Sequence, residues 1–173
     1  MKKTMLILLM TMIPLMAMAQ STDPAIMKAK EETAVIFDLG RFFGYLNTLE
    51  QEAPELALSR EQMKELYETL NKYLNIDRIE VEDADKTLLY MEEELLKLDQ
   101  LIYVDELAIA KMENRVSGSG AGGGGGSTGS GSGGGQLAGY VAGGVFNPLK
   151  DPSKTIGKDV SAFFNYLKKK LNK

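Results

Sequence analysis

The sequence predicts an all-α protein: a helical hairpin or small bundle of long helices, a Gly/Ser-rich linker and a C-terminal amphipathic helix. Two observations support this. Apolar residues recur three and four positions apart over most of residues 20–117, which is the period of a helix with one buried face. Residues 118–135 are almost entirely Gly and Ser and hold 12 of the 18 glycines. Such a segment buries no apolar surface, so it predicts a flexible linker between helical parts.

Composition and charge narrow the classes of function. The 173 residues include no Cys, His or Trp, which excludes an imidazole base, a thiolate nucleophile, a disulfide and a zinc finger. The remaining polar residues form no recognisable catalytic constellation, so we expect a protein that is not an enzyme and needs no cofactor or metal. Residues 20–117 carry 11 basic and 22 acidic side chains, whereas residues 136–173 carry 7 basic and 2 acidic ones. This asymmetry predicts an acidic domain and a basic tail that engages something anionic.

Residues 1–19 have the organisation of a secretory signal peptide. Lys2 and Lys3 precede an apolar run from Met5 to Met16, and Ala17-Met18-Ala19 is an A-x-A cleavage pattern. The run is shorter than the about 20 residues that a membrane-spanning helix needs. We therefore expect an exported protein of the bacterial periplasm or cell envelope.

The first helix of the acidic domain is predicted to begin at Asp23-Pro24 and to end before Pro54, a length of about 28 residues. Asp23 offers a capping carboxylate, and Pro24 suits the first helical position. Gly40 and Gly44 form a G-x-x-x-G pair that admits a close neighbouring helix, and a local packing requirement is favoured over a dimer motif. The apolar stripe consists of Val35, Leu39, Phe42, Leu46 and Leu49.

A second helix is predicted to begin after Ser59 and to reach Asn75. Ser59 and Gln62 have the spacing of a capping box, in which each side chain bonds to the backbone N–H of the other residue. Leu58 and Met63 occupy the two positions of a hydrophobic staple, which pack together across the helix start.

The segment from residue 75 to residue 85 is polar and acidic. It contains no Gly and lacks the ligand spacing of a calcium loop, so it is interpreted as a solvated helix start. A third long helical stretch is predicted to run from Ala84 to about Val116, with a short break near Lys97-Leu98-Asp99. Its recurring apolar positions are Ala84, Leu88, Met91, Leu95, Leu98, Leu101, Val104, Ala108 and Met112.

One motif resembles a known family. Leu58-Ser59-x-x-Gln62 is similar to the L-T-x-x-Q motif of the Spy/CpxP family of periplasmic helical proteins. Leu96-Lys97-x-x-Gln100 resembles a second copy 38 residues later, with Lys97 where the family has Thr or Ser. The resemblance covers about residues 24–116. It implies long helices in a curved, often dimeric shell, hence a possible homodimer, and an ATP-independent chaperone or stress adaptor.

The basic tail, residues 136–173, is predicted to end in an amphipathic helix. Residues 136–149 are small and apolar but too short to span a bilayer. Asp151-Pro152 repeats the pattern of a capping carboxylate followed by Pro, which predicts that a helix of about 20 residues begins there. The candidate membrane- or partner-binding residues are Ile156, Val160, Phe163, Phe164, Leu167, Lys168, Lys169 and Lys170.

Two interpretations of this tail remain open. In one, Phe163 and Phe164 insert into an anionic membrane surface while the lysines contact lipid headgroups. In the other, the apolar face docks on the acidic domain or on a protein partner. Export and the lack of an Arg-aromatic platform argue against nucleic acid. The sequence therefore predicts a non-enzymatic envelope protein, a binding module whose tethered basic helix engages a membrane surface or a protein groove. The alternative is a Spy/CpxP-like chaperone or stress adaptor.

Overall fold

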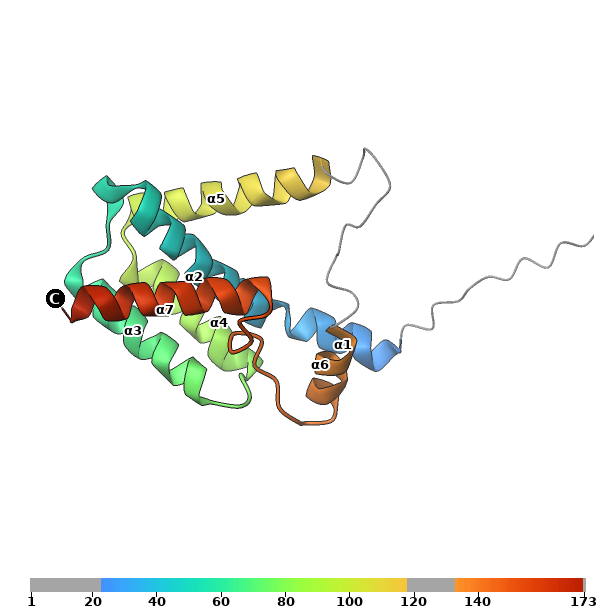
Figure 1. Cartoon of the computed structure of the whole chain (residues 1–173). Coiled ribbons are helices and arrows are strands. Elements are labelled where there is room, and N and C mark those ends of the chain that lie inside the picture. Colours follow the sequence, from blue (N-terminus) through green and yellow to red (C-terminus); the bar gives the residue numbers. More distant parts are fainter. Residues whose placement is uncertain (1–22, 118–132, 173) are drawn as a thin grey trace, which may run out of the picture.

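The computed structural model describes residues 23–117 and 133–172, which form an all-α bundle (Figure 1). The predicted signal peptide and residues 118–132 of the predicted linker lie outside the described residues. No helix in the described part is long and apolar enough to cross a membrane. The elements are α1 (Pro24–Glu32), α2 (Ala34–Glu52), a 3-10 turn (Pro54–Leu56), α3 (Arg60–Asn75), α4 (Val81–Tyr90), a π-helical turn (Met91–Leu95), α5 (Leu98–Ser117), α6 (Gly133–Val141) and α7 (Thr155–Leu171).

Helix α2 is the central element of the bundle. Helices α4, α5 and α7 all pack against it, and α7 also packs against α3. Full burial of one large apolar side chain stabilises the fold by about 1.5–3 kcal/mol, so α2 anchors the hydrophobic core. Its buried apolar side chains are Ile36, Leu39, Phe42, Phe43, Leu46 and Leu49.

The first helix begins where the sequence predicts but is interrupted at Thr33. The Asp23 carboxylate accepts a hydrogen bond from the Ala25 N–H at 2.9 Å, which confirms the predicted cap. Thr33 has φ −82° and ψ −2° and separates α1 from α2. Its hydroxyl donates to the Ala29 carbonyl at 2.6 Å, and this type of side-chain bond bends helices. The prediction of one continuous helix was therefore wrong.

The predicted start of α3 is confirmed in detail. The Gln62 N–H donates to Ser59 Oγ at 3.2 Å, and the Ser59 N–H donates to Gln62 Oε1 at 2.8 Å. Leu58 is buried and Met63 packs against the same core, as expected for the two staple positions. The helix ends at Asn75, as predicted.

The third helical stretch is broken close to the predicted place. A π-helical turn follows α4, Leu96 adopts an extended conformation with ψ 149°, and α5 begins at Leu98. The break resets the phase of the helix, so the predicted series of apolar positions does not continue on one face through it. Leu98 was expected in the core, yet 73% of its surface is exposed. By contrast, Ala84 and Met91, which precede the break, are buried.

The segment that leads into α7 is fixed to the loop after α3. Phe146 forms an isolated β-bridge with Arg78. The Phe146 N–H donates to the Asp77 carbonyl at 2.9 Å, and the Phe146 carbonyl accepts from the Ile79 N–H at 3.0 Å. The Asn147 side-chain amide donates to the last turn of α3, at the Tyr73 carbonyl. The small apolar segment before α7 thus contributes a buried aromatic ring to the core.

Two expectations about the tail need correction. Gly133–Gly135 were assigned to the linker but form the first turn of α6. Asp151 was expected to cap the last helix, but its carboxylate accepts from the N–H and the hydroxyl of Ser153, at 3.0 and 2.6 Å, which closes a turn. Helix α7 begins later, at Thr155, with Lys154 in the N-cap position.

The G-x-x-x-G pair of α2 receives α7. A Cβ atom on Gly40 would overlap Ile156 Cγ2, and one on Gly44 would lie 3.3 Å from Asp159 Cβ. The absence of these two Cβ atoms lets the backbones of α2 and α7 approach closely. The pair therefore serves a packing contact within the chain, and the acidic domain and the basic tail form one packed body.

Candidate binding surfaces

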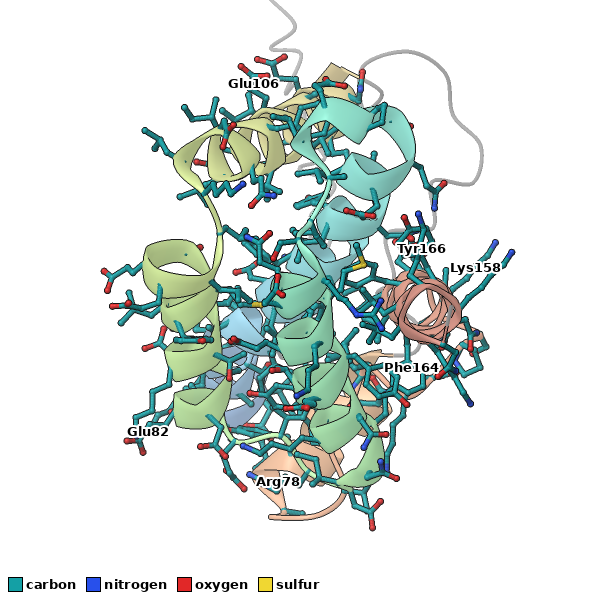
Figure 2. All side chains as sticks on the ribbon, turned by 90° about the vertical axis from the view of Figure 1, so that its left-hand side faces the viewer. Arg78, Glu82, Glu106, Lys158, Phe164 and Tyr166 are labelled. Carbon is teal, nitrogen blue, oxygen red and sulfur yellow. The ribbon has the colours of Figure 1, made fainter. Side chains whose placement is uncertain are left out.

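The residues predicted to bind a membrane or partner lie on both sides of α7 (Figure 2). Val160, Phe163 and Leu167 are fully buried in the bundle core. Phe164 stacks on the ring of Tyr67, on α3, with ring centroids 4.9 Å apart. Ile156 is half-buried against Gly40. Lys168, Lys169 and Lys170 are exposed, and Figure 2 shows Lys158 pointing away from the other helices.

This placement changes what the tail offers to a partner. The face that a membrane would accept is covered by α2 and α3 in the folded chain. In the folded chain, Val160, Phe163 and Leu167 are therefore not available for insertion into a membrane, because their apolar surface is already buried in the core. Of the two interpretations, docking on the acidic domain describes where the helix lies.

A buried carboxylate ties α7 to the rest of the bundle. Glu50, near the end of α2, accepts a hydrogen bond from the Tyr166 hydroxyl at 2.5 Å and one from the Leu58 N–H, also at 2.5 Å. Burial and this carboxylate raise the pKa of the Tyr166 phenol. A single side chain thus joins α2, α7 and the start of α3.

The two glutamines of the motif copies meet inside the bundle. Gln62 Nε2 donates to Gln100 Oε1 at 2.8 Å, and both residues are buried. Each oxygen also accepts from the backbone at its own helix start: Gln62 Oε1 from the Ser59 N–H at 2.8 Å and Gln100 Oε1 from the Lys97 N–H at 3.0 Å. Gln100 therefore repeats the role of Gln62.

The nitrogens of the same two amides cross between the motifs. Gln62 Nε2 donates to the Leu95 carbonyl at 2.7 Å, just before the second motif, and Gln100 Nε2 donates to the Leu56 carbonyl at 2.9 Å, just before the first. The departure at Lys97 removes only the hydroxyl cap. Next to it, the Asp99 carboxylate accepts from the Gln100 N–H at 3.1 Å.

The structure has an exposed apolar face on α5 that was not predicted from the sequence. Figure 1 shows α5 at one edge of the molecule. Four of its large apolar side chains are at least half exposed: Leu98 at 73%, Ile102 at 50%, Ile109 at 57% and Met112 at 65%. Their spacing of four, seven and three residues places them on one side of the helix. Val104, on another side of α5, is buried against the bundle. The apolar surface of α5 is therefore wider than the part that the bundle covers.

A cleft of about 480 Å³ lies between α2, α4 and α5, beside this face. Its apolar and aromatic lining includes Phe42 and Tyr45 from α2 and Met112 from α5. Its charged lining comprises Asp38, Arg41, Glu92, Asp105 and Lys111. Partial desolvation and the nearby carboxylates, Asp105 foremost, raise the pKa of Glu92, whose side chain is still exposed.

A second hollow, of about 530 Å³, lies between α1, the start of α2, α4 and α6. It combines Val35, Val81 and Tyr140 with the carboxylates of Glu32, Glu82 and Asp85. Within residues 23–117 and 133–172, no three acidic side chains are arranged to hold a metal ion.

No family model matches this chain, and no curated protein or solved structure matches it.

Proposed function

We propose that this chain is a non-enzymatic binding protein of the bacterial cell envelope that holds apolar segments of other polypeptides on the exposed face of α5. The observation that carries the proposal is the row Leu98, Ile102, Ile109 and Met112, which no described helix covers. Contiguous exposed apolar patches on soluble proteins mark interaction sites. The proposal corresponds to the chaperone alternative that the Spy/CpxP resemblance implies.

Two further features support the proposal. Gln62 and Gln100 each accept from the backbone N–H three residues earlier, which supports Leu96–Gln100 as a second copy of the motif on which the Spy/CpxP resemblance rests. The signal-peptide pattern of residues 1–19 favours export to the envelope.

The test is suppression of client aggregation by residues 20–173, with reduced α-lactalbumin as the client and light scattering as the readout. The double variant Ile102→Ser/Ile109→Ser removes the centre of the exposed face. Leu89→Ser is the matched control, because Leu89 is also 50% exposed but lies on α4, outside the exposed face of α5. We expect suppression by the wild type and the control and its loss in the double variant. Equal suppression by all three would refute a role for α5.

A second candidate function is electrostatic contact with an anionic membrane surface, and the exposed lysines of α7 favour it. Lys158, Lys168 and Lys169 are exposed while the apolar side of α7 is buried. Binding would then be superficial and strongly weakened by salt. Co-sedimentation with anionic and neutral vesicles tests it, using these three lysines changed to Gln. Truncation of α7 is unsuitable, because it would remove part of the core.

A further inference from the structure

The cleft beside the exposed face of α5 carries an excess of negative charge. Three acidic and two basic side chains line it. The segment 81–117, which supplies two of its walls, contains ten acidic and four basic side chains, a net charge of −6. Of the two cations in the cleft, Arg41 pairs with Asp38, and Lys111 lies 4.7 Å from the ring centroid of Tyr45. Among the described residues, neither Glu92 nor Asp105 belongs to an ion pair. The cleft thus presents two carboxylates beside apolar and aromatic side chains.

The form of the site selects among modes of peptide recognition. The described residues contain no β-strand, so they offer no sheet edge to which an extended peptide could add. An apolar groove along a helix instead suits an amphipathic helix, whose backbone hydrogen bonds are satisfied internally. The exposed face runs from Leu98 to Met112, which corresponds to about 21 Å along the helix axis. A partner helix of about 14 residues would match this length.

We propose that this cleft and the adjoining exposed face of α5 together bind a cationic amphipathic helix of another polypeptide, with its apolar face on Ile109, Met112 and Tyr45 and its Lys or Arg side chains beside Glu92 and Asp105. The inference rests on the proposed function and specifies the class of client segment.

Two other occupants of the cleft are disfavoured, one by charge and one by the packing of α7. A second copy would bring the same acidic α4–α5 segment against this one, and juxtaposed like charges oppose association. The basic helix of this chain, α7, has already buried Val160 and Phe163 in the core. A cation at the cleft would relieve the mutual repulsion that contributes to the raised pKa of Glu92.

The experiment measures fluorescence anisotropy of labelled model helices with residues 20–173. Three peptides of about 18 residues share one Leu face and carry Lys, Glu or Gln on the other. We expect the Lys peptide to bind about tenfold more tightly than the Glu peptide at low salt, with the difference shrinking at high salt.

Variants place the binding at the cleft and at the adjoining exposed face of α5. We expect Asp105→Lys to weaken binding of the Lys peptide about fivefold and Ile109→Ser to weaken binding of all three peptides. Glu68→Lys makes the same change of net charge on α3, outside the cleft, and should change affinity less than about twofold. Leu89→Ser is the apolar control. Circular dichroism and thermal melts establish that each variant is folded.

Each other outcome overturns the inference in a recognisable way. Equal binding of the Lys, Gln and Glu peptides, with sensitivity to Ile109→Ser, would refute the preference for cations but leave the proposed client-holding function standing. No binding of any peptide, together with no suppression of aggregation, would refute both. A dimer in sedimentation velocity that Ile109→Ser dissociates would show that a second copy occupies the face, which also refutes the inference.

Discussion

The crossed glutamine pair makes a quantitative prediction about stability. Replacing Gln100 by Leu keeps the side-chain volume but removes its three shortest side-chain hydrogen bonds, which join it to the Lys97 N–H, Gln62 Nε2 and the Leu56 carbonyl. A typical intramolecular hydrogen bond contributes about 1 kcal/mol net, and a buried group left without a partner costs about 1–3 kcal/mol. We expect Gln100→Leu to lower the free energy of unfolding by about 3 kcal/mol, a large share of the about 5–15 kcal/mol typical of a domain.

Gln62→Leu should cost a similar amount, because Gln62 bonds to the Ser59 N–H, the Leu95 carbonyl and Gln100. The double variant should cost less than the sum of the two single variants, by about 1 kcal/mol or more, since the shared bond is lost only once and two Leu side chains can pack together. A double-mutant cycle measures this coupling.

The assay is urea unfolding followed by far-ultraviolet circular dichroism, with comparable m-values required for each variant. Gln51→Leu is the matched control, because Gln51 lies exposed near the end of α2 and should change stability by no more than about 0.5 kcal/mol. The reasoning is refuted if Gln100→Leu costs no more than the control. It is also refuted if the costs at Gln62 and Gln100 are simply additive.

Three further predictions test the packing and charge of the bundle. Gly157→Ala should destabilise the protein by about 2 kcal/mol or more, because the new Cβ would overlap the Asp151 carbonyl oxygen; a thermal melt no lower than wild type would contradict this. Phe163→Ala should cost about 3–5 kcal/mol and increase proteolysis within α7, since the ring is fully buried. The raised pKa of Glu92 means that the folded state binds its proton more readily than the unfolded state, so stability declines as pH rises through that titration. Glu92→Gln should flatten this decline and raise the urea midpoint at neutral pH, and a lower midpoint would contradict the interpretation.

Features set by neighbouring residues could be predicted from the sequence. The capping box at Ser59 and Gln62 is local, because both partners lie within one helical turn, and the structure reproduces it. The break at Thr33 is also local in cause, but Thr occurs in many uninterrupted helices. Nothing short of the observed bond to Ala29 distinguishes this one. The exposure of Leu98 depends on the turn that precedes it, which no periodicity argument across the break can anticipate.

Contacts between distant segments could be predicted only in kind. Gly40 and Gly44 predict that some helix approaches closely, but not that Ile156 and Asp159, more than a hundred residues later, supply it. The opposite charges of the two halves predict mutual attraction in the same general way. The sequence therefore indicates that a close contact forms, but the identity of the contacting segment depends on the topology of the fold.

The candidate site lies on the helix whose apolar face is only partly covered by its neighbours. The basic amphipathic helix was the most conspicuous binding element in the sequence, yet α7 fills the close-packed side of α2 and buries its own apolar face in doing so. Helix α5 carries apolar residues over a wide part of its circumference. The described bundle covers only the part that includes Val104. An amphipathic pattern therefore identifies a helix with an apolar face. That face is a candidate binding site only where the fold leaves it exposed. In this chain the unmet face is the row from Leu98 to Met112, beside the carboxylates of Glu92 and Asp105.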